Sequence, residues 1–368
     1  MNGQVRDPLG PCKVIEVYQP ELGLEGVLVV DNVAAGPAIG GLRMATDVSV
    51  DECRRLARAM TLKNAAAGLP HGGAKSVLRA DPHGDPAHKE ALIRAFACAL
   101  RGNEEYIFGP DMGTDEQCMG WVHDEIGRAI GLPRALGGIP LDELGATAYG
   151  LTHAIEVAAE RIDLPLEGAR IVVQGFGSVG RHAARFLVER GARLVAAADS
   201  AGAVAHADGL DIDALEAWKT AGNPLTTFAG GHPLAAEQLI EVDCEVWIPA
   251  ARPDVIDAGN CDRLAARVVA EGANIPVTAE AGARLQARGV LCLPDFIVNA
   301  GGVICGAVEY RGGGQEAAFA AIRERIRANT AEILQRSQRD AVTPRQAALA
   351  LAEQRVREAM ATRRWALF

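Results

Sequence analysis

The sequence predicts a two-domain α/β protein whose second domain holds a doubly wound, parallel β-sheet. Three observations support this fold class. The chain has 368 residues, enough for about two domains of roughly 150 residues each. Short β-branched runs alternate along it with segments of helical periodicity. Residues 169–199 form one strand–turn–helix–strand unit of a length typical of parallel sheets.

Composition excludes several classes of protein. Acidic residues outnumber basic ones by 47 to 37 without a basic stripe, which argues against a nucleic-acid or anionic-membrane surface. No apolar run is long enough to cross a bilayer, and the first ten residues hold no hydrophobic secretory segment. The eight cysteines form no C-x-x-C pair and the histidines no H-x-x-x-H pair, so we expect reduced thiols and no metal. A cytoplasmic protein without nucleic-acid or membrane partners is the expectation.

The first domain is expected over residues 1–138, with an early strand at 27–33, VLVVDNV. A helix is expected over 51–66, where apolar or small residues recur at helical spacing. Ser49 or Asp51 is placed to cap its N-terminus.

The second domain is expected over residues 139–310 and opens with a long amphipathic helix at 142–162. A strand, a glycine-rich turn, a helix and a second strand follow at 169–174, 175–180, 181–190 and 193–198. Three more short apolar runs complete the expected sheet at 244–248, 267–270 and 290–293. Residues 311–368 are expected to form helices that pack back on the first domain.

Gly175, Gly177 and Gly180 form a G-x-G-x-x-G turn between a strand and a helix, the arrangement of a Rossmann-type domain. The first glycine permits the tight turn, the second lets backbone approach a pyrophosphate, and the third lets the helix pack closely. Together with Ser178 and Val179, these glycines are the candidate dinucleotide-binding residues. The alternative is a turn with a purely structural role.

Asp199 ends the next strand, after Gly180 and the intervening helix. An acid at this place accepts hydrogen bonds from the adenosine ribose. It favours NAD as the cofactor and leaves NADP open.

Two lysines and one aspartate are the candidate catalytic groups. Lys63 lies near a helix end among leucine and alanine, and Lys75 follows the glycine pair of HGGAKSV. In poorly solvated, small-residue surroundings the pKa of a lysine falls, which suits it for proton transfer near neutral pH. The alternatives are solvated surface lysines and, for Asp111 in GPDMGTDE, an ordinary turn residue.

Seven motifs together resemble one enzyme family. The sequence is similar to the glutamate/leucine/phenylalanine/valine dehydrogenase superfamily from about residue 25 to about residue 310. In the first domain the resemblance is carried by GPAIGGLRM, LKNAAAGLPHGGAKSV and GPDMGTDE. In the second it is carried by IPLDELGATAYG, GFGSVG, EGANIPVT and PDFIVNAGGV.

The resemblance implies roles for individual residues. Lys63 is similar to the lysine that pairs with the substrate α-carboxylate, Lys75 to the lysine that activates the attacking water, and Asp111 to the aspartate that shuttles protons at nitrogen. The remaining implied positions lie near the nicotinamide, its ribose and the substrate: Thr147, Ala250, Asn274 and Asn299. The resemblance also implies a homo-oligomer.

Two positions depart from the glutamate-specific pattern. Glutamate-specific members have a lysine where this sequence has Ile39 and a serine at the position of Gly306, so both anchors for a side-chain carboxylate are absent. A glutamate side chain would then be desolvated without a charged partner, which is unfavourable by several kcal/mol. We expect Gly109 and Gly306 to add room to the pocket and Val303 to narrow its floor.

The sequence therefore predicts reversible, NAD(P)-dependent oxidative deamination of an apolar L-amino acid to its 2-oxo acid and ammonia. Leucine, valine and isoleucine are the expected substrates, with phenylalanine next. Glutamate is the alternative, because GPDMGTDEQCMGWV also resembles the glutamate-acting branches. A nucleotide-sensing protein without catalysis is the alternative of another class, and the retention of Lys63, Lys75 and Asp111 argues against it.

Overall fold

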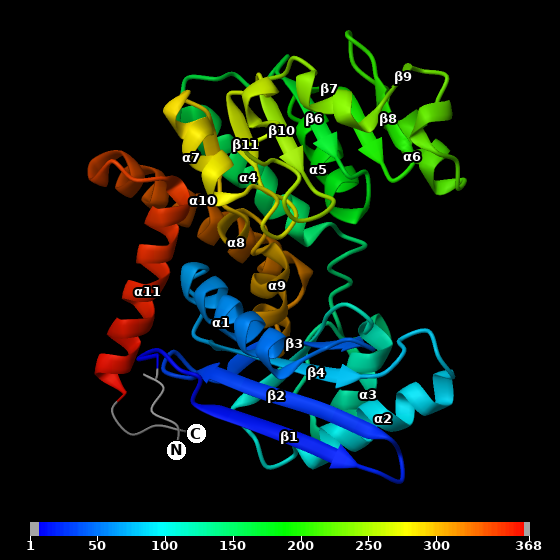
Figure 1. Cartoon of the computed structure of the whole chain (residues 1–368), viewed down its shortest axis with the longest axis vertical. Helices are drawn as coiled ribbons and strands as arrows, with labels where there is room; N and C mark the ends of the chain where they lie inside the picture. Colours follow the sequence, from blue (N-terminus) through cyan, green and yellow to red (C-terminus); the bar gives the residue numbers. More distant parts are fainter. Residues whose placement is uncertain (1–6, 364–368) are drawn as a thin grey trace. The chain divides into compact units, whose positions relative to one another are not determined.

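The computed structural model of the chain describes residues 7–363 and consists of two compact units (Figure 1). Unit 1 comprises the chain up to Pro140, Val303–Ala318 and the chain from Leu349. Unit 2 comprises Leu141–Gly302 and Phe319–Ala348. Of the C-terminal segment expected to pack on the first domain, Phe319–Ala348 therefore groups with unit 2 instead.

The first regular elements of unit 1 alternate between strands and helices. They are β1 (Lys13–Gln19), β2 (Leu24–Asn32), β3 (Ala38–Ala45), α1 (Val50–Ala66), β4 (Gly72–Arg79), α2 (Pro86–Ala99), β5 (Tyr106–Pro110) and α3 (Glu116–Ile126). The predicted strand at 27–33 lies mostly within β2, and the predicted helix at 51–66 is confirmed as α1. Ser49 caps α1, since its side chain accepts a hydrogen bond from the Glu52 amide.

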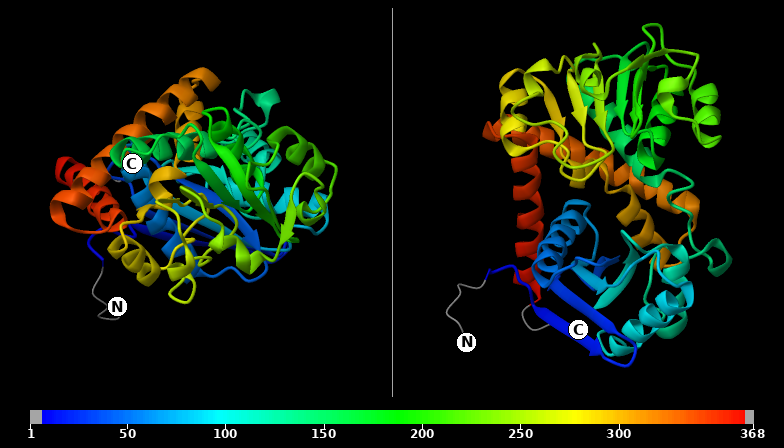
Figure 2. Two further views of the ribbon diagram at one scale, coloured as in Figure 1. Left: turned by 90° about the horizontal axis from the view of Figure 1, so that it is seen from above. Right: turned by 45° about the vertical axis from the view of Figure 1, so that its right-hand side comes forward.

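The sheet of unit 1 has the strand order β1-β2-β4-β3-β5. β3 runs parallel to both β4 and β5, whereas β2 runs antiparallel to β1 and β4. The helix α1 covers one face of this sheet, and α2 and α3 cover the other (Figure 1 and the right-hand view of Figure 2). Each strand therefore presents alternate residues to one or the other helical layer.

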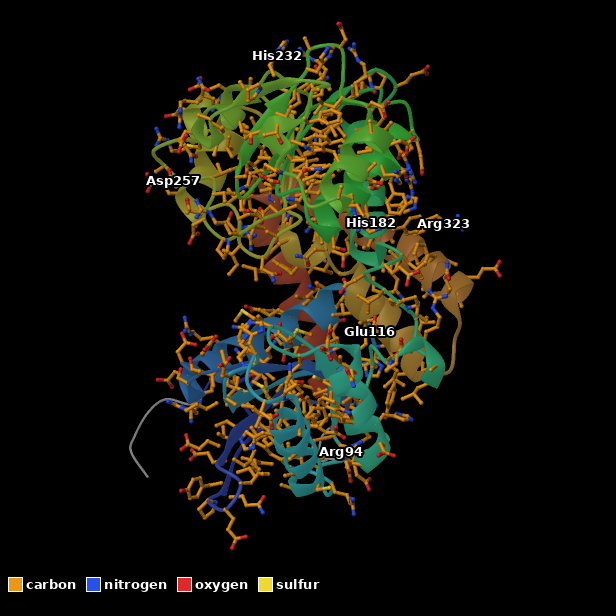
Figure 3. The ribbon with its side chains drawn as sticks, turned by 90° about the vertical axis from the view of Figure 1, so that its right-hand side faces the viewer. Arg94, Glu116, His182, His232, Asp257 and Arg323 are labelled. Atoms are coloured by element: carbon orange, nitrogen blue, oxygen red, sulfur yellow. The ribbon has the colours of Figure 1, made fainter. Side chains whose placement is uncertain are left out.

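The α2/α3 face holds the main apolar core of unit 1. Leu42, Phe96 and Phe108 are fully buried there. Charges also join the two helices: Arg94 on α2, labelled in Figure 3, donates to Asp124 at 2.7 Å and to Glu125 at 2.9 Å. This face is therefore filled by packing, which leaves the opposite face of the sheet for functional groups.

Unit 2 contains the second sheet and its covering helices. Its elements are α4 (Ala146–Arg161), β6 (Arg170–Gln174), α5 (Ser178–Val188), β7 (Arg193–Asp199), β8 (Gly202–Ala205), α6 (Ile212–Thr220), β9 (His232–Leu234), β10 (Val246–Pro249), β11 (Val268–Ala270), α7 (Ala279–Ala287), β12 (Leu291–Leu293) and α8 (Asp295–Val298). The strand order is β12-β11-β10-β6-β7-β8-β9. The strands from β12 to β7 are parallel as expected, but β8 and β9 add an antiparallel edge.

The helix expected at 142–162 is shorter than its periodicity suggests. It begins only at Ala146, because Gly145 adopts a left-handed conformation with φ of +67°. The remaining helices are α9 (Gly301–Tyr310), α10 (Gln315–Asp340) and α11 (Pro344–Thr362). Arg327 on α10 bonds to Glu156 and Glu160 of α4, which explains why this stretch groups with unit 2.

Over residues 7–363, no helix is long and apolar enough to cross a membrane.

Candidate active site

Three neighbouring strands of unit 1 place the candidate residues on the sheet face toward α1. Side chains two positions apart along a strand share a face, so Ile39, Gly41 and Arg43 of β3 project in the same direction. On β4, Lys75 shares this face with Val77, which packs against α1. The face opposite the main core therefore carries the candidate residues beside a smaller apolar cluster that packs against α1.

Lys75 and Asp111 form an ion pair across the middle strand. β3 lies between β4 and β5, so the two residues start from strands about 9–10 Å apart. Lys75 Nζ nevertheless contacts Asp111 Oδ2 directly. Gly41 of β3 makes this possible, because a Cβ there would lie 2.8 Å from Asp111 Cβ and 3.2 Å from Lys75 Nζ. A side chain at position 41 would displace the pair.

The carboxylate of Asp111 is held in place from several sides. Arg43 Nε donates to its Oδ2 at 3.1 Å. Thr114 Oγ1 accepts from the Asp111 amide at 3.0 Å and donates to the Leu42 carbonyl at 2.7 Å. Burial raises the pKa of Asp111, but Lys75 and Arg43 outweigh burial and hold this pKa below its ordinary value. Asp111 is therefore ionised at neutral pH and in contact with an amine.

Lys63 lies in the last turn of α1 and is half-buried. The next residue, Asn64, anchors this end of the helix, because its Nδ2 donates to the Ile39 carbonyl at 3.2 Å and to the Gly72 carbonyl at 2.6 Å. These carbonyls lie near the starts of β3 and β4. Lys63 is thus carried at a fixed place beside the strands that bear Ile39 and Lys75.

The expected side-chain pocket is apolar but less roomy than the sequence suggests. Ile39 is 1% exposed. Ile130 occupies the space next to both glycines: a Cβ on Gly306 would lie 2.4 Å from its Cδ1, and one on Gly109 would lie 3.3 Å from its Cγ1. The expectation that Gly109 and Gly306 add room is therefore wrong. Val303 is half-buried on α9, one turn before Gly306.

The glycine-rich turn of unit 2 has the shape that its spacing predicts. Gly175 has φ of +101°, and a Cβ there would lie 2.7 Å from the backbone of the loop after β10. A Cβ on Gly180 would lie 2.0 Å from the Gly175 carbonyl oxygen. Around Gly177, by contrast, no atom of residues 7–363 other than its chain neighbours lies within 4 Å of a Cβ position. The first-turn amides of α5, from Ser178 and Val179 onward, begin at this opening, which fits a diphosphate.

Asp199, at the end of β7, already has a cationic partner. Lys219 on α6 places its Nζ 2.5 Å from Asp199 Oδ2. The amide of Ala201 donates to Asp199 Oδ1 at 2.9 Å. Burial raises the pKa of Asp199, but Lys219 and the backbone donors outweigh burial and lower it overall. A ligand at this place would meet a fixed carboxylate with an ammonium group beside it.

The candidate nicotinamide residues of unit 2 come from separate segments. Asn299 follows α8 and is buried, and its Nδ2 donates to Asn274 Oδ1 at 3.2 Å. Thr147 lies in the first turn of α4, where its Oγ1 would be 3.4 Å from a Cβ on Gly302. Ala250 follows β10, and its amide donates to the Gln174 carbonyl at 2.7 Å. Asn274 and Asn299 are thus in direct contact.

The loop that carries Asn274 is held by a buried charged cluster. Ile275 has φ of +49°, a strained conformation for a β-branched residue, and its amide donates to Asp295 Oδ2 at 2.9 Å. Arg345, in the first turn of α11, bonds to Asp295 at 2.7 Å and to Glu271. The same cluster therefore holds both flanks of Asn274.

Comparison with known proteins identifies the family. Residues 137–364 match the model described as Glutamate/Leucine/Phenylalanine/Valine dehydrogenase, and residues 11–128 match the Glu/Leu/Phe/Val dehydrogenase dimerisation domain. The chain belongs to this family. It is an NAD(P)-dependent amino-acid dehydrogenase, an oxidoreductase that acts on CH–NH₂ groups.

Relatives of this dehydrogenase use either coenzyme. The NADP-specific glutamate dehydrogenase of Saccharolobus shibatae is 35% identical over 82% of this chain and 75% of its own length. The NAD-specific glutamate dehydrogenase of Staphylococcus aureus is 35% identical over 91% of this chain and 85% of its own length. The hetero-hexameric glutamate dehydrogenase of Thermus thermophilus, solved in a leucine-bound form, has a TM-score of 0.85 at 32% identity, covering 97% of this chain and 91% of that one.

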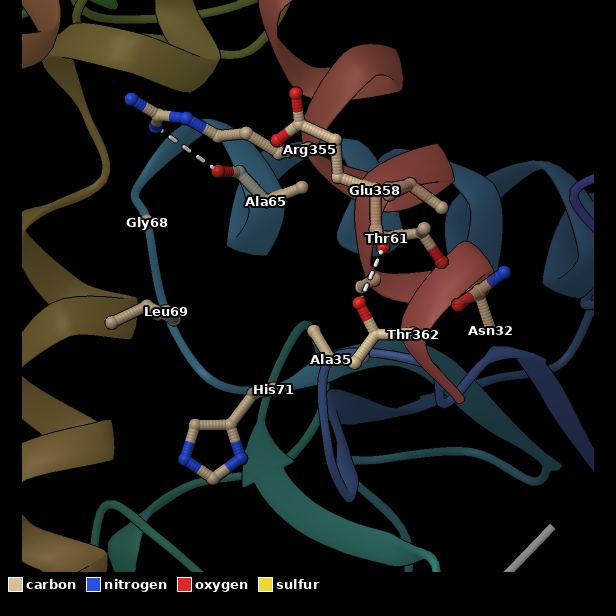
Figure 4. Close-up of a pocket in the computed structure, with 13 residues that line it drawn as sticks. Asn32, Ala35, Thr61, Ala65, Gly68, Leu69, His71, Arg355, Glu358 and Thr362 are labelled. Carbon is tan, nitrogen blue, oxygen red and sulfur yellow. Dashed lines mark hydrogen bonds between the residues drawn. The ribbon is translucent and has the colours of Figure 1, made fainter. Parts of the chain in front are cut away.

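One cavity of unit 1 does not include the candidate catalytic residues. It has a volume of about 360 Å³ and lies between the end of α1 and α11 (Figure 4). Arg355 borders it and donates to the Ala65 carbonyl at 3.2 Å. Since neither Lys75 nor Asp111 lines this cavity, the dehydrogenase chemistry is not assigned to it.

Sequence reasoning missed three residues of the candidate site. Gly41 lies in GPAIGGLRM, and its two-residue spacing from Ile39 and Arg43 was the signal that places it on their face. No sequence pattern indicates a role for Ile130, because its contacts come from β5 and from α9. Lys219 had no signal either, because it reaches Asp199 from a helix 20 positions away.

Proposed function

We propose that this dehydrogenase converts an apolar L-amino acid reversibly to its 2-oxo acid and ammonia. The observation that supports this substrate class most is the buried Ile39 on the catalytic face, with Ile130 packed beside Gly306. A substrate carboxylate in such surroundings would lose water without gaining a charged partner. His71, which precedes the glycine pair of β4, does not replace the missing cation, because burial lowers its pKa.

The Lys75–Asp111 pair supports the acid–base steps. In the proposed scheme Lys63 binds the substrate α-carboxylate and so orients the Cα hydrogen. The coenzyme supplies the hydride acceptor. Transfer of the Lys75 proton to Asp111 across their contact leaves Lys75 Nζ neutral, and Nζ then takes a proton from the water that attacks the resulting iminium carbon. Asp111 gives the proton it received to the departing nitrogen. The sheet fixes both groups in advance, which lowers the barrier that orientation would otherwise impose.

For the coenzyme we propose a preference for NAD with measurable use of NADP. Asp199 suits the two ribose hydroxyls of NAD, because a carboxylate accepts their hydrogen bonds. Lys219 partly neutralises that carboxylate and supports acceptance of a 2′-phosphate. Comparing kcat/KM for NAD and NADP tests this proposal, and a tenfold preference for NADP would overturn it.

Glutamate is the second candidate substrate, and the named relatives favour it. At 35% identity over 91% of the chain, the S. aureus relative is named for glutamate. Overall identity, however, reports mainly the shared scaffold, whereas side-chain selection depends on a few pocket residues. We therefore rank the apolar substrates first on the local chemistry at positions 39, 130 and 306.

A panel of the twenty L-amino acids with NAD and with NADP, followed at 340 nm, tests the proposed function. We expect the highest kcat/KM with leucine, isoleucine or valine. A higher kcat/KM with glutamate than with leucine would show that another residue supplies the cation and would reverse the ranking. Absence of turnover with every amino acid, together with coenzyme binding, would instead support the nucleotide-sensing alternative.

We also propose that the protein assembles as a homo-oligomer. The match of residues 11–128 to a dimerisation domain and the hexameric state of the T. thermophilus relative support this. Within unit 1, β1 is an edge strand with Tyr18 69% exposed, as expected of a strand that pairs with another copy. Light scattering after size exclusion measures the mass, and a monomer at micromolar concentration would contradict the proposal.

A further inference from the structure

Glu309 is a buried carboxylate that no step of the proposed reaction uses. It lies on α9, three residues and about one turn after Gly306. Its Oε1 accepts from the backbone amides of Gly131 at 2.8 Å and Leu132 at 3.1 Å, and its Oε2 accepts from the Ile139 amide at 2.8 Å. Hydrogen bonds of this kind, from an amide to a carboxylate, are stronger than those between neutral groups.

The three donors lie at the two ends of one loop. Residues 131–139 contain a single turn of 3-10 helix at Arg134–Leu136, and within the loop the Gly138 amide donates to the Pro133 carbonyl at 3.2 Å. One carboxylate therefore joins both ends of this loop to α9. The residue that makes this link is distant in sequence, since Glu309 lies 170 positions beyond Ile139.

The residue directly before the loop is Ile130, and it is also held by β5. The Ile130 amide donates to the Phe108 carbonyl at 2.8 Å, and the Phe108 amide donates to the Arg128 carbonyl at 3.0 Å. The backbone of Ile130 is thus bonded to β5, the strand that carries Gly109. The residues that follow Ile130 form the loop that Glu309 bonds to α9. Its side chain fills the space next to Gly306.

We propose that Glu309 is a positioning residue for amino-acid selectivity. By holding the loop at 131–139, its carboxylate keeps Ile130 beside Gly306 and so sets the size of the side-chain pocket. This inference rests on the proposed function, in which Ile130 borders that pocket. Glu309 touches neither substrate nor coenzyme in this scheme, so its loss changes selection among side chains and leaves coenzyme use unchanged.

Glu309→Gln tests the inference directly. The variant keeps the side-chain volume but loses the charge and one of the two acceptor oxygens. We expect the ratio of kcat/KM for leucine to that for valine to change at least fivefold, while the KM for the coenzyme stays within twofold. Glu105→Gln is the matched control, because Glu105 is also buried in unit 1 but pairs with Lys13. An unchanged ratio in folded Glu309→Gln, or an equal change in the control, would overturn the inference.

A double-mutant cycle separates positioning from a general loss of stability. Ile130→Val alone should change the leucine/valine ratio, and the same substitution in the Glu309→Gln background should change it at least threefold less, because Ile130 is then no longer held. Equal effects of Ile130→Val in both backgrounds would contradict the inference. Circular dichroism and thermal unfolding establish that each variant is folded.

Gly306→Ala keeps the inference testable if Glu309→Gln does not fold. The added Cβ would lie 2.4 Å from Ile130 Cδ1, which is closer than the two atoms can approach. If Ile130 is held firmly, the new methyl group takes up space that the substrate side chain needs. We expect at least a tenfold loss in kcat/KM for leucine with an unchanged coenzyme KM. Wild-type selectivity in Gly306→Ala would show that Ile130 yields freely and would overturn the inference.

Failure of the proposed substrate class is distinguishable from failure of this inference. If the wild-type panel shows glutamate as the preferred substrate, the apolar assignment fails. The ratio of glutamate to its shorter homologue aspartate then replaces the leucine/valine ratio in the same variants. A change in that ratio confined to Glu309→Gln supports the positioning role, and no change overturns it.

Discussion

Each unit contains an aspartate–lysine pair, and the two pairs are built in opposite ways. In unit 1 the side chain of Lys75 is 6% exposed and that of Asp111 is 24% exposed. In unit 2 the side chain of Asp199 is 6% exposed and that of Lys219 is 33% exposed. The first pair therefore buries its cation, whereas the second buries its anion.

This difference indicates what each pair can do. Lys75 projects from β4 into the space that Gly41 of β3 leaves open, so its amine is held in contact with Asp111. Lys219 projects from a helix at the surface, so it can turn toward a ligand while Asp199 stays in place. Under the proposed function, the same two residue types would serve proton transfer in one unit and coenzyme selection in the other, depending on which member is buried.

Removing the buried amine should have the largest effect. We expect Lys75→Ala and Asp111→Asn to lower kcat by about 10²–10⁴-fold, because each loses a group that moves a proton in the proposed scheme. Coenzyme affinity, measured by fluorescence titration, should be retained, because the glycine-rich turn belongs to unit 2. A variant that keeps more than about a tenth of wild-type kcat, a barrier change of roughly 1.4 kcal/mol, would contradict the acid–base role.

Lys63→Ala sharpens the comparison within unit 1, since Lys63 is expected to bind charge and not to move protons. The α-carboxylate would lose a charge-assisted hydrogen bond in both the ground state and the transition state, worth about 1.5–3 kcal/mol. We therefore expect a raised KM for the amino acid together with a lower kcat in steady-state kinetics. A lowered kcat at unchanged KM would assign Lys63 to chemistry and not to anchoring.

Lys219→Met breaks the pair of unit 2. Without the ammonium group, a 2′-phosphate would face the Asp199 carboxylate alone, whereas the hydroxyls of NAD would still be accepted. We expect kcat/KM for NADP to fall about tenfold, or roughly 1.4 kcal/mol, and that for NAD to change less than threefold. Equal changes for both coenzymes would show that Lys219 does not select between them.

Glu271 and Arg345 form a third acid–cation pair for comparison, one with a structural role. Glu271→Gln removes its titratable group. Burial raises the pKa of Glu271 to about 7, although Arg345 opposes the shift. The folded state then holds a proton that the unfolded state releases near pH 4.5, so this group's contribution to stability is complete below about pH 4.5 and is lost as pH rises through about 7. The free energy of unfolding should fall by about 3 kcal/mol as the pH rises from about 4.5 to about 7.

Urea unfolding of the wild type and of Glu271→Gln at several pH values measures this loss. The glutamine cannot titrate, so the stability of the variant relative to the wild type should rise between pH 5 and pH 8. Parallel pH profiles for the two proteins would contradict the raised pKa. We expect kcat at pH 8 to stay within about twofold of wild type, as suits a group outside the acid–base steps.

Much of the secondary structure could be predicted because its signals are local. The apolar spacing of 51–66 and the cap at Ser49 define α1 within one segment, and the glycines of 175–180 define the turn before α5. Lys75 could be selected from its glycine neighbours in the same way. The start of the helix predicted at 142 was misplaced, because the conformation of Gly145 ends the preceding turn there.

The sequence by itself therefore determined the family, the order of the elements and the identity of the titratable groups. Tertiary structure alone decided which of these groups meet. The order β4-β3-β5 brings Lys75 to Asp111 over Gly41, and α9 brings Gly306 against Ile130. The physical reason is that periodicity and capping act over a few neighbouring residues, whereas burial and charge pairing depend on the register of segments far apart in the chain.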